Sequence, residues 1–203
     1  MIEITGVVPD FPLFRGIKDK VDQARLPNAG LFNKIYRARD STGMITLDIP
    51  GFGLREIAHV VSDYSGTHSY AGTIRPAVRD RLGRLAESVD VHILTSDTFG
   101  TAEQELRDLP VTLHLLKGEG HDEQKRAYAL ALDPRRMAAF GNGNNDRLLL
   151  STVRDAGGLA IAVDNGEGCA VDTMLAANLV IHGAENALDL LLDGNRCRAT
   201  LRF

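Results

Sequence analysis

The sequence predicts an α/β fold with a Rossmann-like, doubly wound parallel sheet and a β-hairpin at its start. Short β-branched segments alternate with segments whose apolar residues recur at helical spacing. Parallel strands need such intervening helices, because the right-handed crossover between them must cover a face of the sheet. Polar residues gather where the predicted strands end, which is the edge at which ligands bind in sheets of this kind.

The composition indicates one globular core, without a strongly basic or membrane-spanning segment. The chain has 203 residues, 44% of them hydrophobic and 25% charged, with a net charge of -4 and a pI near 5.9. That balance argues against nucleic acid or an anionic membrane as the principal partner. We find no bilayer-length apolar run and no signal peptide, and we expect a cytoplasmic protein. Cys169 and Cys197 fit neither a disulfide framework nor a Cys-x-x-Cys metal site.

The chain divides near Gly43. Residues 1–43 contain Pro9, Pro12 and Pro27 and lack a clear period, which predicts an irregular N-terminal extension. Residues 44–203 are predicted to form the core. They open with residues 45–49, which alternate at period two and are followed by Pro-Gly, so we expect a hairpin whose second arm continues into a buried strand.

The remaining elements alternate regularly. The predicted strands are residues 58–63, 90–95, 111–116, 137–141, 159–163 and 178–182. The predicted helices are about residues 75–88, 100–108, 121–132, 144–155, 168–176 and 184–192.

Four successive positions in this pattern carry the side chains that phosphoryl transfer needs. They are Asp63, the segment Thr95-Ser96-Asp97, Lys125, and the loop Gly141-Asn142-Gly143-Asn144-Asn145-Asp146. Such chemistry requires an oxygen nucleophile, a fixed cation, hydroxyl or backbone donors, and usually Mg2+ on carboxylates. Taken singly, each residue is more often a turn, a helix cap or a solvated lysine. Their order around one sheet edge favours a single site.

In that site Asp63 is predicted to be the nucleophile, Thr95 a hydroxyl donor and Lys125 the fixed cation. Asp146 and Asn142 are predicted to form the magnesium side. Glycines at positions 66, 141 and 143 would let the backbone approach the ligand closely.

These motifs resemble those of the haloacid dehalogenase (HAD) superfamily, and in particular the phosphorylation domain of P-type ATPases. The resemblance covers roughly residues 44–203, and the C-terminal segments 187–192 and 198–202 are similar to those of small soluble P-type-ATPase-like phosphatases. Only about one helical crossover separates Thr67 from Thr95, so a nucleotide-binding insertion and a large cap domain are not expected.

The resemblance implies an aspartyl phosphate on Asp63 and Mg2+ as cofactor. The metal would be held by Asp63, the Ser65 carbonyl and Asn142, with Asp146 ligating or orienting it. Thr95 and Lys125 would hold the transferring group. The further phosphate-binding residues would be Gly66, Thr67, Ser96 and Asn145.

Two residues depart from the usual pattern. Hydrolytic members place a second Asp at the position of Ser65, where it serves as acid and base. A hydroxyl cannot do this near neutral pH, so we expect slow hydrolysis of the phosphoenzyme. Asn142 stands where many members have a carboxylate, and a neutral amide oxygen should bind Mg2+ less tightly.

The leading hypothesis is therefore a Mg2+-dependent phosphohydrolase with an open site, acting on phosphorylated small molecules or phosphoproteins, and a homodimer is compatible with it. A phosphate-binding or regulatory protein with little turnover is the alternative. A receiver-like phosphoacceptor domain ranks third, because receivers have an acidic pair on an earlier strand, and none precedes Asp63.

Overall fold

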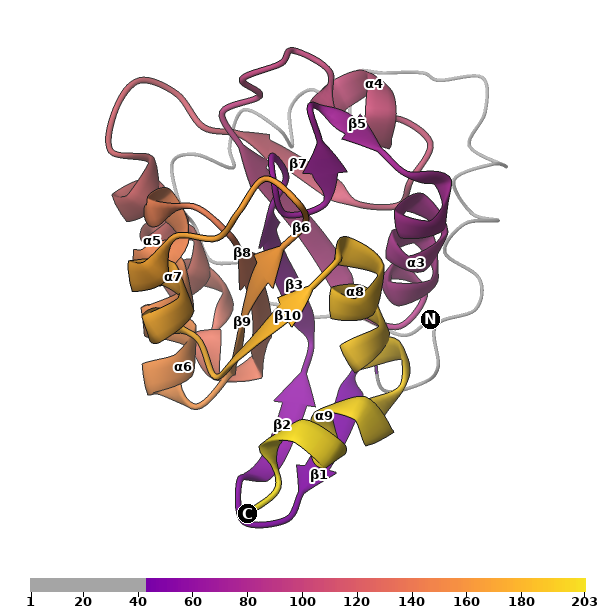
Figure 1. Cartoon of the computed structure of the whole chain (residues 1–203), viewed down its shortest axis with the longest axis vertical. Coiled ribbons are helices and arrows are strands. Elements are labelled where there is room, and N and C mark those ends of the chain that lie inside the picture. The colour runs from indigo at the N-terminus through magenta and orange to yellow at the C-terminus, as the bar shows by residue number, and fades with distance from the viewer. Residues whose placement is uncertain (1–42) are drawn as a thin grey trace, which may run out of the picture. The chain divides into compact units, whose positions relative to one another are not determined.

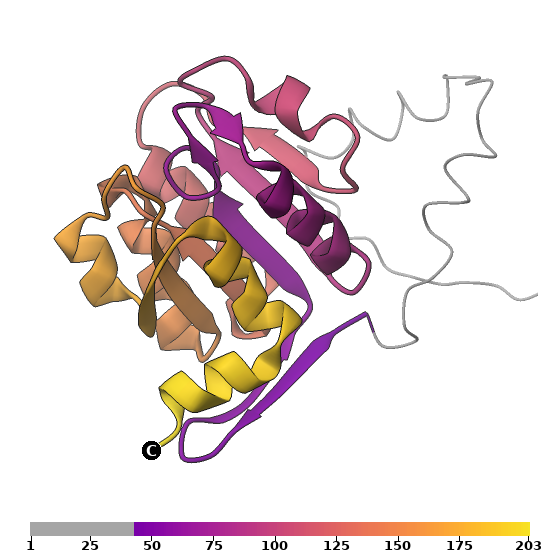
Figure 2. The same cartoon turned by 45° about the vertical axis from the view of Figure 1, so that its right-hand side comes forward.

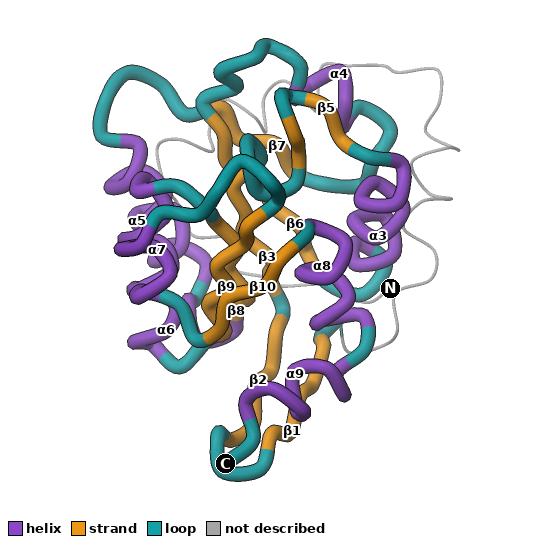
Figure 3. The backbone as a smooth tube through the Cα atoms, viewed as in Figure 1, coloured by secondary structure: helices purple, strands orange, loops and turns teal. Residues whose placement is uncertain are grey.

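The structure is a computed structural model that describes residues 43–203. Except for Gly43, the predicted N-terminal extension lies outside these residues. A six-stranded parallel sheet forms the centre of the described part, in the order β10-β9-β8-β3-β6-β7 (Figures 1 and 3). Its strands are β3 (His59–Asp63), β6 (Asp90–Thr95), β7 (Thr112–Leu115), β8 (Met137–Gly141), β9 (Leu159–Asp164) and β10 (Leu179–His182). This confirms the predicted fold class.

Helices cover both faces of the sheet (Figure 1). On one face lie α3 (Pro76–Ala86) and α8 (Ala184–Leu192), and on the other lie α5 (His121–Leu132), α6 (Arg147–Ala156) and α7 (Val171–Ala176). The short helix α4 (Ala102–Leu106) follows β6, and two 3-10 turns, η1 (Pro134–Arg136) and η2 (Asn144–Asp146), flank β8. No cap domain is present among residues 43–203.

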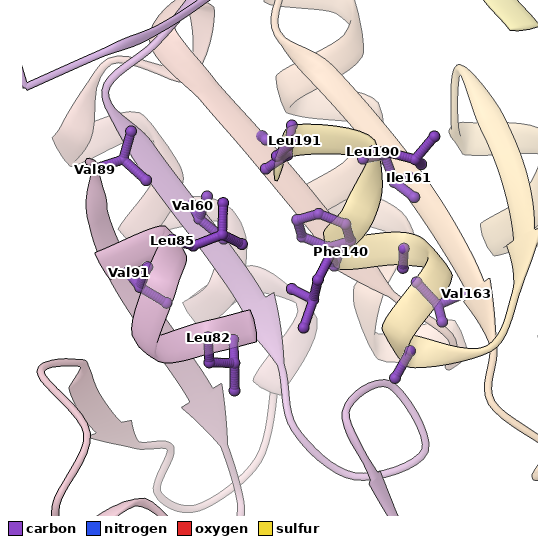
Figure 4. Close-up of a cluster of buried hydrophobic side chains, with 14 of the residues drawn as sticks. Val60, Leu82, Leu85, Val89, Val91, Phe140, Ile161, Val163, Leu190 and Leu191 are labelled. Carbon is purple, nitrogen blue, oxygen red and sulfur yellow. The ribbon is translucent and has the colours of Figure 1, made fainter. Parts of the chain in front are cut away.

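Alternating side chains on the central strand divide the core into two parts. Val60 belongs to the cluster beneath α3 and α8, and Val61 belongs to the cluster beneath α5 and α6. Figure 4 shows the first cluster, with Val60 and Phe140 from neighbouring strands facing Leu82 of α3 and Leu191 of α8. Burial on both faces explains why the central strands have near-continuous apolar sequences and hold their carboxyl ends in fixed positions.

The predicted hairpin is present as β1 (Ile45–Ile49) and β2 (Gly53–Ile57), and its second arm continues through Ala58 into β3. The C-terminal helix α9 (Gly194–Leu201) lies against it (Figure 2). Arg198 Nε donates to the carbonyl of Asp48 at 2.7 Å. The sequence analysis did not predict α9, because its polar sequence has little apolar periodicity and the hairpin supplies its packing surface.

A second small hairpin stands above the sheet and was not predicted. It consists of β4 (Ser69–Tyr70) and β5 (Thr73–Ile74), and strands of two residues are too short to produce a sequence pattern. We call residues 69–74 the flap.

Some predicted helices begin later than expected. The helix predicted at residue 100 begins at Ala102, because Asp97 Oδ1 accepts the N–H groups of Thr101 and Ala102, each at 3.0 Å. The helix predicted from residue 168 begins at Val171, after Gly168 in the left-handed region. Within residues 43–203, no helix is long and apolar enough to cross a membrane.

Candidate active site

Asp63 ends the central strand β3 and is buried beside a lysine. The Nζ atom of Lys125, on α5, lies 2.6 Å from Asp63 Oδ1. The same nitrogen lies 2.6 Å from Oδ1 of Asp146, at the end of η2. Three elements that are distant in sequence therefore bring the predicted nucleophile, the predicted cation and the predicted acidic residue into direct contact. We call these three residues the charge cluster.

The charge cluster is almost fully withdrawn from water. The side chains of Lys125 and Asp146 are 0% exposed, and that of Asp63 is 8% exposed. Burial alone would lower the pKa of Lys125, but the two carboxylates outweigh that effect and raise it. Burial raises the pKa of Asp63 to about 7, the charge of Asp146 adds to the rise, and Lys125 opposes it. The charge cluster contains two carboxyl groups and one ammonium group, so its negative charge is not fully balanced and a bound cation could complete the balance.

Thr67 and Asn142 lie on the other side of Asp63. Thr67 Oγ1 donates to Asn142 Oδ1 at 3.0 Å and lies 3.4 Å from Asp63 Oδ2. Gly66 makes this approach possible, because a Cβ atom at that position would lie 2.4 Å from Asn142 Nδ2, and its φ of +77° also favours glycine. The loop after Asp63 and the loop formed by residues 141–146 are therefore in contact through Thr67 and Asn142.

Asp146 also fixes the backbone of the loop formed by residues 141–146. Its Oδ2 accepts the backbone N–H groups of Asn142 at 3.0 Å and of Gly143 at 2.9 Å. Since its Oδ1 is held by Lys125, both oxygens are engaged by protein donors. Of the two roles predicted for Asp146, ligating or orienting, this geometry favours the orienting one.

The other predicted site residues occupy the same edge with different exposure. Thr95 is buried at the end of β6, and its Oγ1 accepts the N–H of Asp97 at 2.9 Å, which leaves its hydroxyl proton to donate. Ser65 is partly exposed in the turn after Asp63. Ser96 and Asn145 are exposed, and the structure shows neither in contact with the charge cluster. Their roles in phosphate binding stay predictions.

Comparisons with known proteins identify a relative of this chain and its fold. No family model matches the chain. The chain is 43% identical over 68 residues to an uncharacterized protein of Methanocaldococcus jannaschii, a match that spans 34% of this chain and 69% of the archaeal protein. The two proteins belong to the same family.

Solved structures identify the fold. The chain is similar to a putative 3-deoxy-D-manno-octulosonate 8-phosphate phosphatase from Vibrio cholerae, with a TM-score of 0.54, 19% identity, and coverage of 78% of this chain and 98% of that one. A putative HAD superfamily (subfamily III A) hydrolase from Legionella pneumophila matches with a TM-score of 0.54, 20% identity, and coverage of 70% and 86%. The chain has the haloacid dehalogenase fold.

A third neighbour of this HAD-type fold was solved with ligands. It is the 3-deoxy-D-manno-octulosonate 8-phosphate phosphatase from Moraxella catarrhalis, in complex with a magnesium ion, a phosphate ion and the sugar acid. Its TM-score is 0.53 at 16% identity, and the match covers 82% of this chain and 95% of that one. At these identities the comparisons show the fold, and the chemistry has to be argued from this chain's own residues.

The residues described here suit Mg2+ by donor chemistry. Asp63, the Ser65 carbonyl and Asn142 offer oxygen atoms, which this cation prefers. The charge cluster also carries more negative than positive charge. Only Asp63 among these donors is charged, and within residues 43–203 no group of three or more His, Cys, Asp or Glu side chains forms a metal site.

Sequence reasoning missed the residues that hold the flap over this edge. Gly72 O accepts from Thr101 Oγ1 at 2.6 Å and from Tyr64 OH at 3.2 Å. Asn165 Nδ2 donates to Ser69 O at 3.3 Å. Asn165 directly follows β9, so the strand-end rule that selected Asp63 and Thr95 could have found it. These contacts hold the first residue of the flap and its turn in place.

A cavity of about 410 Å³ lies beside the flap. It is lined by Tyr70, Thr73, Arg75 and Asn165, and Asp63 is not among its walls. Arg75 is also paired with Asn165 at 2.6 Å and with Glu185 at 3.3 Å. This cavity is therefore separate from the charge cluster.

His68 is buried against Ser62, the residue that precedes Asp63. Its Nε2 lies 2.8 Å from Ser62 Oγ, and its ring packs against Phe140 with centroids 5.8 Å apart. Its Nδ1 has no hydrogen-bond partner within the described part of the chain. Burial lowers the pKa of His68 to about 4, so the imidazole is neutral at physiological pH.

The buried imidazole predicts a loss of stability in mild acid. An unfolded histidine has a pKa of about 6.5, so as the pH falls the unfolded chain takes up this proton before the folded chain does. The contribution of His68 is complete above about pH 6.5 and is lost as the pH falls toward 4. Between pH 7.5 and pH 5 it should amount to about 2 kcal/mol.

Denaturant unfolding of the wild type and of His68→Asn, at pH 7.5 and at pH 5, measures the contribution of His68 to stability. Asparagine keeps a donor for Ser62 and does not titrate, so the stability difference between the two proteins should shrink by about 2 kcal/mol at pH 5. A difference that stays the same at both pH values would contradict the buried neutral state.

Proposed function

We propose that this protein is a Mg2+-dependent phosphohydrolase that acts through an aspartyl phosphate on Asp63. The observation that carries the proposal is the charge cluster. A carboxylate at the carboxyl end of the central strand lies 2.6 Å from a buried lysine, which is in turn fixed by Asp146. A nucleophile beside a preorganised cation is the arrangement that phosphoryl transfer requires.

Each side chain has a role that its contacts support. Lys125 holds Asp63 Oδ1, which leaves Oδ2 as the oxygen available to attack phosphorus. Lys125 and the hydroxyl of Thr95 would hold the equatorial oxygens of the phosphoryl group. Asp146 keeps Lys125 and the loop at Asn142 in position. Bound to Asp63, Asn142 and the Ser65 carbonyl, Mg2+ would neutralise negative charge on the phosphoryl group.

Ser65 determines how fast we expect water to hydrolyse the aspartyl phosphate. Its hydroxyl does not ionise near neutral pH and cannot remove a proton from water as a carboxylate does. We propose that Asp63 accepts a phosphoryl group readily and that water releases it slowly. The substrates would be phosphorylated small molecules or phosphoproteins.

A regulatory protein with little turnover is the second candidate, because Ser65 and Asn142 both weaken catalysis. Retained binding of phosphate or beryllofluoride without any turnover of phosphate compounds would favour this candidate. A receiver-like role is less favoured. Lys125 is held by Asp146, at the end of the loop formed by residues 141–146, and such a loop has no role in a receiver domain.

The nucleophile is tested with Asp63→Asn, which preserves shape and removes the attacking charge. Turnover of a generic phosphate compound with Mg2+ should fall by about 10³-fold or more. Asp108→Asn is the matched control, because Asp108 has 85% of its side chain exposed and pairs with Arg79, outside the charge cluster. Wild-type turnover in Asp63→Asn would remove the basis of the proposal.

The metal site is tested with Asn142→Asp, which adds a charge to a predicted ligand and can still accept from Thr67. The Mg2+ concentration for half-maximal activity should fall several-fold, because a charged oxygen binds the cation more tightly. Asn144→Asp adds the same charge at an exposed position in the same loop and should change it little. An unchanged or higher requirement in Asn142→Asp would place the metal elsewhere.

A further inference from the structure

The side chains around Asp63 offer no acidic proton to a departing group. The hydroxyl of Thr67 is donated to Asn142, and the ammonium group of Lys125 is held between two carboxylates. Asp146 accepts hydrogen bonds with both oxygens. None of these groups is free to act as a general acid.

Other acidic side chains at this edge of the sheet are also engaged. Glu167 Oε1 accepts the N–H of Ala71, on the flap. Tyr64 donates its hydroxyl to Gly72 O, on the flap. His68 faces Ser62, behind the strand that carries Asp63. Asp97 Oδ1 caps the start of α4. The hydroxyl groups of Ser65 and Thr95 remain, and both are too weakly acidic to protonate a leaving oxygen near neutral pH. Within residues 43–203 the site therefore has a nucleophile and a cation but no general acid.

The leaving group must then depart as an anion. An alkoxide from an alkyl phosphate is strongly basic and leaves slowly without a proton, whereas a carboxylate is a stable anion and needs none. The intermediate on Asp63 is itself an anhydride of a carboxylic acid and phosphoric acid. Transfer from another anhydride of this kind is nearly balanced in free energy, and transfer from an alkyl ester is uphill.

We propose, resting on the function proposed above, that the substrates of this site are acyl phosphates. A carboxylate oxygen of Asp63 forms a bond to phosphorus while the bond between phosphorus and the acyl oxygen breaks. The leaving carboxylate keeps the bonding electron pair. Water then attacks the phosphoenzyme, Asp63 regains its electron pair, and the proton from water leaves with inorganic phosphate or solvent.

Charge favours acyl phosphates over phosphoanhydrides such as pyrophosphate. Both have leaving groups that are stable as anions. A phosphoanhydride also brings the negative charge of its second phosphoryl group toward a charge cluster that already contains two carboxylates and one lysine. An acyl phosphate carries negative charge on one phosphoryl group only.

The test compares kcat/KM for acetyl phosphate, p-nitrophenyl phosphate, phenyl phosphate, glycerol 3-phosphate and pyrophosphate. The full chain is used at saturating Mg2+, with the rate of Asp63→Asn subtracted as background. Among the monophosphates, kcat/KM should fall as the leaving group becomes more basic. Glycerol 3-phosphate should lie about 100-fold or more below acetyl phosphate, a factor typical of a missing general acid. Pyrophosphate should also lie below acetyl phosphate.

Ser65→Asp supplies the missing acid. It should raise kcat/KM for glycerol 3-phosphate by about tenfold or more and change that for acetyl phosphate much less. Ser65→Asn, which is similar in size and cannot donate an acidic proton, should leave the ratio of the two substrates unchanged. This ratio separates an effect on the leaving group from a general loss of structure.

Two results would overturn the inference alone. They are Asp63-dependent turnover of glycerol 3-phosphate within about tenfold of acetyl phosphate, or pyrophosphate as the better substrate. If Asp63→Asn left the turnover of every compound unchanged, the proposed function itself would fail.

Discussion

The site depends on the burial of Lys125 between Asp63 and Asp146. A lysine with no exposed surface is costly to bury unless its charge is paired, and here both partners lie at 2.6 Å. Removing one partner of such a group typically costs about 3–5 kcal/mol, because it leaves an uncompensated charge in the interior. This requirement ties the end of β3, the first turns of α5 and the turn η2 to one another. The geometry that stabilises the lysine is also the geometry that places a cation beside the nucleophile.

The positions of the neighbouring loops depend on the charge cluster. Asp146 meets Lys125 with one oxygen and holds the backbone of Asn142 and Gly143 with the other, so the position of the fourth motif is coupled to the lysine. Asn142 in turn accepts from Thr67, which returns to the loop that carries Asp63. A closed set of contacts therefore surrounds the nucleophile. Because its members are already paired with one another, this set of contacts offers no acidic proton, which is the basis of the substrate class proposed above.

The sequence predicted much of this arrangement. The bounds of β6, β8, α5 and α8 agree with the predicted ranges to the residue, since turn or cap residues such as Gly120, Pro134 and Gly183 mark their ends. The strand-end rule also brought Asp63, Thr95 and Asp146 to one edge, and the structure places Lys125 between Asp63 and Asp146. This agreement arises because buried parallel strands leave a clear pattern in the sequence.

Other features depend on contacts that a local pattern does not contain. The flap has strands of two residues, and α9 relies on the β1–β2 hairpin for its packing. The pairing of His68 with Ser62 is formed by a turn that folds back on its own strand. The engagement of both Asp146 oxygens was likewise visible only in three dimensions.

In the proposed mechanism, Asp63 accepts a phosphoryl group and holds it, because Ser65 cannot activate water. Acid-quenching the full chain during turnover of acetyl phosphate with Mg2+, followed by mass spectrometry, measures this directly. We expect one phosphoryl group on the peptide that contains Asp63. It should be abundant in the wild type, absent in Asp63→Asn and sparse in Ser65→Asp, where breakdown is faster. A phosphoryl group on another residue, or a longer-lived intermediate in Ser65→Asp, would contradict this mechanism.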